Sequence, residues 1–455
     1  MRETIALVER YSAIDYEQLP PRSVDMAKKC LIDYLGCTYA AFSFGSSQIA
    51  RDFAVENYAR GKCTIIGATD KLVAAGACFT NGTTGHAAEL DDCSNEGGGH
   101  PGVVVMPVAL SMGENLGLSG RDLIRCIIIG YDTFIRIGKA ANQQSLFGRG
   151  FHPTALLGTF GAAMTGARAL NLSIDQSANA MGIAGSFVAG NLECYTDGSH
   201  TKRLHAGIVS AAGVTAAILA SKGYTGPKSI LEGPRGFFHG YCEGVRIEKL
   251  TEAGDGFEID RVSFKPHACC RANQAAIDAV LEILSSNDVD CAAIRSILVE
   301  LSRTPYDIVG QPSEIKMNPK NSVDGQFSAH YSVAIACLER KAFLEEYTDE
   351  SIRRQDVAEL LKKVVVRHDP GLDQFFPESF PARVTLAMCD GRKLVKEVRY
   401  PEGDSENPLS WEKILRKFDR CVAGSMLDKE RKEQTIASVQ NLEGIGDIRD
   451  FTTLL

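Results

Sequence analysis

The chain has 455 residues, more than the ~250–300 that a single hydrophobic core usually serves, so two structural units are expected. Apolar residues make up 44% and charged residues 23%, which is typical of a globular protein and excludes extensive disorder. The net charge of −8 gives no basic surface for nucleic acid, and an anionic ligand would have to be held by local lysines and arginines.

The sequence gives no sign of export or membrane insertion. The N-terminal segment MRETIALVERYSAIDYEQL carries charges throughout and lacks an apolar signal core. The two most apolar segments are either interrupted by Arg125 and Asp132 or rich in small residues, and we expect neither to span a membrane. The 14 cysteines include no C-x-x-C pair, which indicates reduced thiols rather than disulfides or cluster ligands. We therefore expect a cytoplasmic protein without membrane contact.

Helical patterns dominate the first 250 residues. Ser119 and Ser173 each precede an apolar periodic segment and have Asp122 or Gln176 three positions on, which predicts capped helix starts. The segment RLHAGIVSAAGVTAAILASKG predicts a helix that ends at Gly223. Small residues are frequent between residues 153 and 222, so these helices can approach closely.

A different pattern begins near residue 255. RSILVELSR, KKVVVRHD and ARVTLAMCDGRKLVKEVRY are typical of strands, and Asp390-Gly391 predicts a hairpin turn. The segment after Pro408 is again helical. The predicted fold class is therefore mainly α with an α+β insertion. Residues 1–260 and 401–455 form an all-helical domain, and residues 261–400 form a smaller mixed α/β lid.

One short stretch, ELDDCSNEGGGHP, concentrates polar side chains, and its glycines would let the backbone pass close to a ligand. A lone carboxylate is usually solvated and a lone histidine is usually a hydrogen-bonded core residue, but the clustering favours a functional role. The candidates are His86, Glu89, Asp91, Asp92, Cys93 and His100. His86, Asp91 and His100 are of metal-binding types, yet no compact metal motif occurs, so we predict no metal.

Two further polar stretches lie at expected helix starts. His152 precedes a proline, where it could cap the helix or face an anion bound at the helix terminus. Lys202, Arg203 and His205 lie at the start of a small-residue helix, where cations oppose the helix dipole. A bound anion would relieve that opposition, whereas a solvated basic turn is the alternative explanation.

The last polar stretches lie beyond residue 260. SFKPHACCRANQAAIDAV contains Lys265, Cys270 and Arg271, and FSAHYSVAIA contains Tyr331. Adjacent cysteines point in different directions in regular structure, so Cys269 and Cys270 are not expected to form a zinc pair, and at least one should be a core thiol.

These motifs together resemble the MmgE/PrpD family, which includes 2-methylcitrate dehydratase, cis-aconitate decarboxylase and iminodisuccinate epimerase. The matching segments occur in family order and cover nearly the whole chain: NGTTGHAAELDD…HP, GFHPTALLGTFGAA, DGSHTKRLHAG, GYTGPKSILEGPRGFF, FKPHACCR and FSAHYSVAIA. Nearest in motif is the cis-aconitate decarboxylase-like branch. The resemblance implies a helical domain with an inserted lid, and a homodimer.

The resemblance also implies a pocket for a small di- or tricarboxylate. Its catalytic residues would be Glu89, His100, His152, Lys202 and Tyr331. Its substrate-binding residues would be Cys93, Arg203, Lys265, Cys270 and Arg271. Animal decarboxylases of the family have aspartate, threonine and histidine where Glu89, Cys93 and Cys270 stand here. Relatives of the fungal cis-aconitate decarboxylase branch usually have a histidine where Gln274 stands.

The function expected is that of a cofactor-free lyase acting by proton transfer next to a carboxylate, as in cis-aconitate decarboxylation or 2-methylcitrate dehydration. Lysines and arginines would offset carboxylate charge, and imidazoles would move the proton because they titrate nearest neutral pH. An isomerase of a dicarboxylate such as iminodisuccinate, or a non-catalytic carboxylate-binding homologue, are the alternatives.

Overall fold

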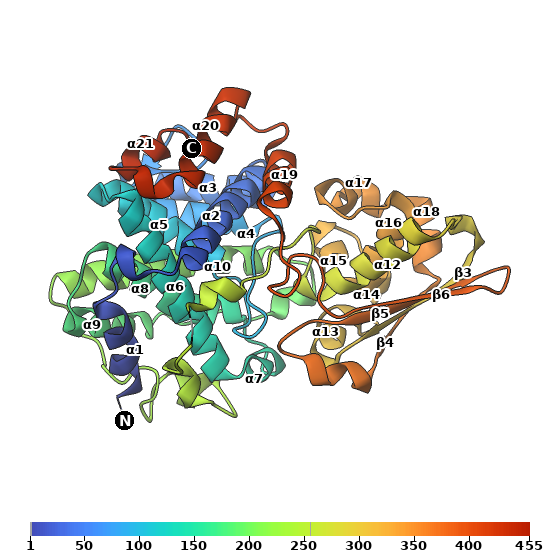
Figure 1. The fold of residues 1–455 in the computed structure, drawn as a ribbon, viewed down its shortest axis with the longest axis horizontal. Coiled ribbons are helices and arrows are strands. Elements are labelled where there is room, and N and C mark those ends of the chain that lie inside the picture. Colours follow the sequence, from blue (N-terminus) through green and yellow to red (C-terminus); the bar gives the residue numbers. More distant parts are fainter. Residues whose placement is uncertain (1, 255) are drawn as a thin grey trace.

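The structure is a computed structural model, which describes residues 2–254 and 256–455 and has two units (Figure 1). The larger unit is helical and contains both ends of the chain. Its helices are α1 (Glu3–Ser12), α2 (Pro21–Ala41), α3 (Gly45–Asn57), α4 (Ala74–His86), α5 (Gly102–Leu116), α6 (Gly120–Ala141), α7 (Gln143–Gly148), α8 (Pro153–Ala169), α9 (Ile174–Ala184), α10 (Thr201–Ser221), α11 (Phe237–Tyr241), α19 (Trp411–Val422), α20 (Lys429–Gln440) and α21 (Ile448–Thr452). A small hairpin that the sequence analysis missed is formed by β1 (Arg60–Thr64) and β2 (Lys71–Leu72).

The smaller unit contains a four-stranded mixed sheet. Its strands are β3 (Ile294–Leu301), β4 (Val364–His368), β5 (Ala382–Met388) and β6 (Lys393–Val398), in the order β4-β3-β5-β6. Its helices are α12 (Gln274–Ser286), α13 (Arg303–Pro305), α14 (Glu314–Met317), α15 (Ser322–Gln326), α16 (Ala329–Glu339), α17 (Asp349–Ile352) and α18 (Gln355–Leu361). Strands β3 and β4 are parallel, whereas β5 pairs antiparallel with β3 and β6.

The predicted helix starts and the hairpin are confirmed. The Oγ atoms of Ser119 and Ser173 accept hydrogen bonds from backbone amides three residues on, at 3.2 Å in both cases. Gly223 follows α10 and Gly391 lies in the β5–β6 turn, with φ of +91° and +94°. Glycine adopts this left-handed conformation without the steric cost that a side chain would bring.

Helix α10 packs in the middle of the helical unit against α4 and α8. Its small residues allow this, because a Cβ added at Gly207 would lie only 2.2 Å from the Phe79 carbonyl oxygen and one at Gly213 would lie 2.2 Å from Ala162 Cβ. By length and composition alone, α10 could cross a membrane. A core helix has the same properties, and α10 lies among neighbouring helices.

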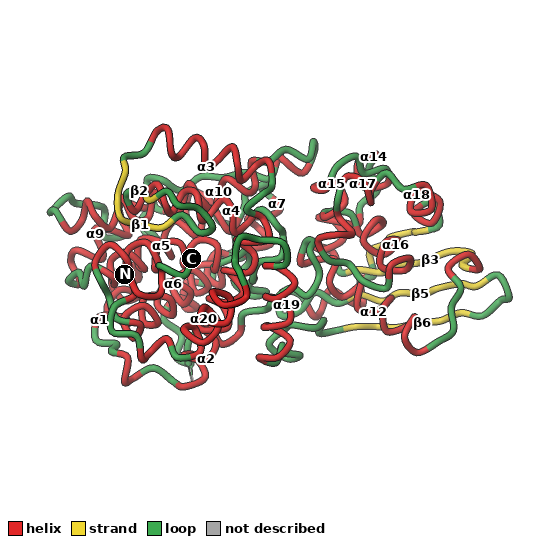
Figure 2. Tube along the Cα trace, turned by 90° about the horizontal axis from the view of Figure 1, so that it is seen from above, coloured by secondary structure: helices red, strands yellow, loops and turns green. Residues whose placement is uncertain are grey.

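Alternating burial along the strands explains why one face of the sheet is covered. Ile297, Val299 and Leu301 of β3 are fully buried, whereas Val365 of β4 and Val395 of β6 are about half exposed. Helix α12 packs against β5 and β6, and α16 packs against β4. Figure 1 shows α12, α16, α17 and α18 on one side of the sheet, whose strands are yellow in Figure 2. The mainly α fold with an α+β unit is therefore confirmed.

The cores of the two units meet. The second core runs from Ala268 to Val398 and also includes Cys37, Leu90 and Cys421 of the helical unit. Helix α19, which follows the second unit, packs against α2. The chain thus leaves and re-enters the helical unit beside the polar stretch at residues 89–101; the predicted boundaries at 260 and 400 stay a prediction.

Candidate active site

A small cavity lies between the two units, with a volume of about 50 Å³. The polar loop after α4, the starts of α8 and α10, and the segments before α12 and α16 all contribute to its wall. Seven of the ten predicted site residues line it: Glu89, Cys93, His100, His152, Lys202, Cys270 and Arg271.

The polar loop after α4 is held in one conformation by its neighbours. Cys93 exchanges two backbone hydrogen bonds with Ser263, of 2.9 and 2.8 Å, which joins the loop to the segment that enters the second unit. Glu89 has φ of +53°, a strained conformation that persists where surrounding contacts enforce it. A Cβ on Gly99 would lie 2.8 Å from the backbone nitrogen of Thr154, so this glycine lets the loop approach α8.

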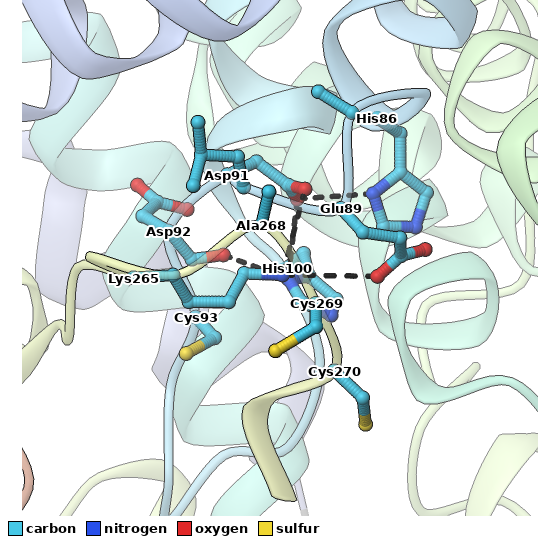
Figure 3. Close-up of polar contacts among 12 residues, drawn as sticks. His86, Glu89, Asp91, Asp92, Cys93, His100, Lys265, Ala268, Cys269 and Cys270 are labelled. Carbon is cyan, nitrogen blue, oxygen red and sulfur yellow. Dashed lines mark hydrogen bonds and ion pairs between the residues drawn. The ribbon is translucent and has the colours of Figure 1, made fainter. Parts of the chain in front are cut away.

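Asp91 holds two imidazoles (Figure 3). One of its oxygens, Oδ2, lies 3.0 Å from His86 Nδ1 and 3.1 Å from His100 Nδ1. His100 Nδ1 also lies 2.8 Å from the carbonyl oxygen of Asp92. Both partners of His100 Nδ1 are acceptors, so this nitrogen carries a proton. In the neutral ring the lone pair is then on Nε2, which makes no hydrogen bond with any other described residue.

Two lysines flank the same carboxylates. Lys202 Nζ is paired with Glu89 Oε1 and lies 3.0 Å from His86 Nε2. The ammonium donates to that nitrogen, so His86 has its proton on Nδ1, facing Asp91. Lys265 Nζ is fully buried, 3.7 Å from Glu89 Oε2 and 3.8 Å from Asp91 Oδ1, and it has no hydrogen-bond partner among the described residues.

These contacts determine the charges. Burial opposes ionisation of Glu89, but Lys202 and Lys265 lower its pKa to about 2. Burial likewise opposes ionisation of Asp91, yet His86, His100 and Lys265 hold its pKa well below the usual value. Burial and the neighbouring Lys202 lower the pKa of His86 to about 4. Two carboxylates therefore balance two ammonium groups, and His86 is neutral.

His152 belongs to a second imidazole pair. Its Nδ1 lies 3.0 Å from His205 Nδ1, and its ring stacks on His86 with a centroid distance of 5.8 Å. Burial, followed by Lys202 and His205, lowers the pKa of His152 well below its usual value, and burial with Lys202 lowers that of His205 to about 4. With both rings neutral, one Nδ1 donates and the other accepts, which fixes opposite tautomers.

Arg271 anchors the second unit to the loop. Its Nη2 pairs with Asp404, its Nε donates to Asn95 Oδ1 at 3.0 Å, and Ser263 Oγ donates to the same Asp404 oxygen at 2.7 Å. Nη1 of Arg271 has no partner among the described residues. Arg271 is thus a structural ion-pair partner that retains one donor group in the cavity wall.

Three predicted site residues do not line the cavity. Tyr331 donates its hydroxyl to the carbonyl oxygen of Glu346 at 2.6 Å, inside the core of the second unit, so its expected place in the pocket is wrong. Arg203 turns away toward a groove beside α3, because successive residues on α10 point about 100° apart. Lys265 lies behind Glu89 rather than at the surface of the cavity.

The cavity wall also includes side chains that the sequence analysis did not select. Besides Tyr195, they are Ser94, Gln143, Phe147, Thr154, Ile308, Phe327 and Phe380. None of these side chains is charged, and none belongs to a recognisable motif. Their place in the cavity wall can therefore be seen only in the folded structure. Tyr195 could have been noticed, because it lies seven positions before Lys202 in the polar segment ahead of α10.

Three residues of metal-binding types, His86, Asp91 and His100, lie close together. One possible ligand atom from each lies within 4.8 Å of the other two. However, Lys265 lies 3.8 Å from Asp91, and Lys202 occupies the Nε2 side of His86. Two ammonium groups beside the trio oppose a divalent ion electrostatically. The donor set therefore fits an Asp-bridged imidazole pair better than a metal centre.

Asp92 lies beneath the loop and gives a pH-dependent prediction. It is buried without a cation, and burial raises its pKa to about 7, although Tyr131 and the Gly102 amide donate to it. The folded state keeps a proton that the unfolded state loses near pH 4, so rising pH favours unfolding between about pH 4 and 7.

Replacing Asp92 with asparagine should remove this loss of stability. Relative to wild type, Asp92→Asn should gain about 1.4 kcal/mol of unfolding free energy per pH unit within that window. Urea denaturation at pH 5 and pH 7.5 measures the difference. If the unfolding free energies of the two proteins differ by the same amount at both pH values, Asp92 is ionised in the folded state at both, which would contradict the prediction.

Comparison with known proteins gives matches along almost the whole chain. The MmgE/PrpD N-terminal domain matches residues 6–250, and the MmgE/PrpD C-terminal domain matches residues 267–443. The chain belongs to the MmgE/PrpD family.

Curated relatives are similar to this chain over more than nine-tenths of their own lengths. A cis-aconitate decarboxylase from Aspergillus terreus is 27% identical over 459 residues, which cover 96% of this chain and 93% of the relative. A cis-aconitate decarboxylase-like protein, oryM, from Aspergillus oryzae is 26% identical and covers 96% and 94%. The human cis-aconitate decarboxylase is 26% identical and covers 96% and 91%.

The residues that depart from the MmgE/PrpD pattern differ in whether they line the cavity. Gln274 is fully buried and donates to the His267 carbonyl oxygen at 3.0 Å, so it braces the turn before α12 and does not line the cavity. Cys93 and Cys270 do line it. Burial raises the pKa of Cys93 to about 12, and burial also raises that of Cys270, so both are neutral thiols near pH 7.

Proposed function

We propose that this MmgE/PrpD protein is a cofactor-free lyase of a small di- or tricarboxylate, with cis-aconitate decarboxylation as its reaction. The observation that carries the proposal is His100: Asp91 holds its Nδ1, its Nε2 has no hydrogen-bond partner within residues 2–254 and 256–455, and it lines the cavity together with Lys202. The names of the relatives support a lyase and give no support to an isomerase.

His100 is suited to proton transfer. Its Nδ1 proton faces Asp91 and the Asp92 carbonyl oxygen, so Nε2 is the atom that can accept a proton from a ligand and return it. The Asp91 carboxylate lies where it can stabilise the imidazolium that forms on protonation. Asp91 therefore orients His100 without contacting the substrate itself.

Charge balance determines how a polyanion would bind. Lys202 and Lys265 are already matched by Glu89 and Asp91, so they do not provide two unpaired positive charges as the sequence analysis assumed. Added carboxylates would raise the pKa of the neutral imidazoles His86 and His152, which could then take up protons. Bound substrate and a protonated imidazole would arrive together, which is the state that decarboxylation requires.

In the proposed reaction, the bond between a carbon atom and one carboxylate breaks, and its electron pair stays on that carbon as CO2 leaves. A neighbouring carboxylate and double bond delocalise the pair, and Lys202 stabilises the resulting negative charge. A protonated imidazole, His100 or His152, then gives its proton to carbon. Each cycle consumes one proton, which solvent replaces.

The cavity is too small for such a substrate in the present conformation. Its volume of about 50 Å³ corresponds to one or two waters, since a water occupies roughly 30 Å³. We infer that the second unit moves away from the helical unit to admit substrate and closes again to exclude water. Arg271, Phe327 and Phe380 form the part of the wall that would move with it.

Proton NMR of the purified protein with cis-aconitate, 2-methylcitrate and citrate in D2O tests the proposal. The expected result is loss of cis-aconitate, with deuterium on the product carbon and CO2 release. Elimination from 2-methylcitrate alone would make the protein a dehydratase of the same lyase class. Binding of these acids without turnover would instead indicate a non-catalytic carboxylate-binding protein.

A chelator control addresses the metal alternative directly. Treatment with EDTA followed by gel filtration should leave the rate unchanged. A loss of activity that returns only with a divalent ion would contradict the cofactor-free mechanism and assign His86, Asp91 and His100 to that ion.

We also propose a homodimer, as the family resemblance suggests, and a cytoplasmic location, which suits the 14 free cysteines. A groove of about 720 Å³ between α3, α4 and α10 supports it, since Ile49, Phe53 and Ile208 there are 67%, 49% and 45% exposed. Apolar patches of this kind often mark interfaces. Light scattering should give twice the chain mass of 49.2 kDa, and Ile49→Glu should lower it; a monomeric wild type would contradict the proposal.

A further inference from the structure

Tyr195 brings a phenol into the cavity from the segment before α10. The short turn η2 (Glu193–Tyr195) follows a stretch that is tied to the start of α8. The His152 amide donates to Gly190 at 3.1 Å, and the Leu192 amide donates to Gly150 at 2.8 Å. These hydrogen bonds bring the segment just before Tyr195 to the start of α8, and Tyr195 and His152 both line the cavity.

The ring of Tyr195 is also held by the second unit. It packs on Phe327 with a centroid distance of 4.6 Å, and Lys202 Nζ lies 5.3 Å from the centre of the same Phe327 ring. Tyr195 and Lys202 thus share one aromatic neighbour at the boundary between the two units.

The hydroxyl of Tyr195 differs from those of the core tyrosines. The buried hydroxyls each donate to a protein acceptor: Tyr11 to Asp132, Tyr34 to Asn81, Tyr131 to Asp92, Tyr331 to Glu346 and Tyr347 to Ser332. Within residues 2–254 and 256–455, the Tyr195 hydroxyl donates to no residue. Tyr195 is half-buried and lines the cavity, so its hydroxyl keeps its donor free for solvent or for a ligand.

We propose that Tyr195 is a catalytic residue that donates a hydrogen bond to a substrate oxygen on which negative charge develops. The inference rests on the proposed function, and it makes Tyr195, in place of Tyr331, the catalytic tyrosine of the site. The substrate oxygen that accepts this hydrogen bond belongs to the carboxylate that delocalises the electron pair after CO2 leaves. This donor lies in the enclosed cavity, where such hydrogen bonds stabilise a transition state most effectively.

The environment of Tyr195 decides between donating a hydrogen bond and transferring a proton. Burial, with Cys270 and Glu89 nearby, raises the pKa of Tyr195 well above its usual value. The phenolate is therefore disfavoured, and the proton stays on the phenol oxygen through the cycle. Proton transfer to carbon remains with the imidazoles.

Tyr195→Phe tests the inference, with Tyr331→Phe as the matched control. Both variants remove one phenol oxygen from the full-length chain. Tyr195→Phe should lower kcat for cis-aconitate about 10–100-fold and leave the unfolding midpoint unchanged, because no protein partner loses a hydrogen bond. Tyr331→Phe should keep kcat and lower the unfolding midpoint, because Glu346 loses its donor.

Calorimetric titration with cis-aconitate, together with turnover, distinguishes a failure of the Tyr195 role from a failure of the proposed function. Wild-type turnover with an unchanged kcat in Tyr195→Phe would overturn the role of Tyr195 and leave the proposed function standing. Absence of both turnover and binding in the wild type would overturn the proposed function and this inference with it. A fall in kcat that accompanies a lower unfolding midpoint in Tyr195→Phe would show a structural role and would also overturn the inference.

Discussion

His100→Asn is expected to lower kcat about 10²–10⁴-fold and to leave the unfolding midpoint close to that of the wild type. The asparagine amide can take the place of Nδ1–H and donate to Asp91 and to the Asp92 carbonyl oxygen, which lie 3.1 and 2.8 Å from that nitrogen. It has no counterpart of Nε2. The variant therefore removes the proposed proton-transfer atom and keeps the contacts that hold the loop.

Initial rates with cis-aconitate, together with thermal unfolding, measure this effect. His205→Asn is a useful comparison, because it also replaces an imidazole bound through Nδ1 but lies one ring farther from the cavity. It should reduce kcat much less than His100→Asn. Equal activity of His100→Asn and the wild type would refute the assignment of His100.

Lys202→Met is expected to abolish turnover, with a rate loss of about 10³-fold or more, and to destabilise the fold. The ammonium pairs with Glu89 and donates to His86 Nε2, so its removal leaves a buried carboxylate with only the more distant Lys265 at 3.7 Å. Breaking a buried ion pair on one side typically costs about 3–5 kcal/mol of unfolding free energy. We therefore expect Lys202→Met to unfold at a lower urea concentration than the wild type.

The double variant Lys202→Met/Glu89→Gln separates stability from catalysis. Replacing the carboxylate as well removes the unpaired charge and should restore much of the unfolding free energy in urea denaturation. Turnover should stay absent, because the cation that stabilises developing negative charge is still missing. Recovery of activity in the double variant would show that Lys202 acts only as the partner of Glu89.

Much of the fold could be predicted because local signals agree with the tertiary structure. Ser119 and Ser173 cap the helices they were expected to start, and the Asp390-Gly391 turn joins β5 to β6. The β1–β2 hairpin was missed, since β1 reads RGKCT and β2 has only two residues, so neither shows a clear strand alternation.

The site was predicted less completely than the fold. Motifs located Lys202 and His100, but the direction of each side chain depends on tertiary packing. Adjacent residues of α10 illustrate this, because Lys202 faces the cavity and Arg203 faces the opposite groove. Sequence could not reveal that Glu89 and Asp91 neutralise the two lysines, since that balance arises from contacts between residues more than 100 positions apart.

The sequence also could not show which tyrosine, Tyr195 or Tyr331, lines the cavity. Tyr331 lies in a recognisable motif but donates to Glu346 inside the core. Tyr195 lies in the polar segment before α10 and reaches the cavity only because residues 190–192 pair with residues 150–152. Such pairing is a property of the folded backbone and leaves no periodic pattern in the sequence.

A crystal structure of the His100→Asn variant with cis-aconitate tests the central claim most directly, because slow turnover should preserve the bound acid. The account predicts the ligand in the cavity between the two units, with carboxylate oxygens within hydrogen-bond reach of Lys202 and of the Tyr195 hydroxyl. The second unit should be closed over the ligand, and the cavity should be larger than the volume of about 50 Å³ seen here. Ligand bound only outside this cavity, such as in the groove between α3 and α10, would contradict the account.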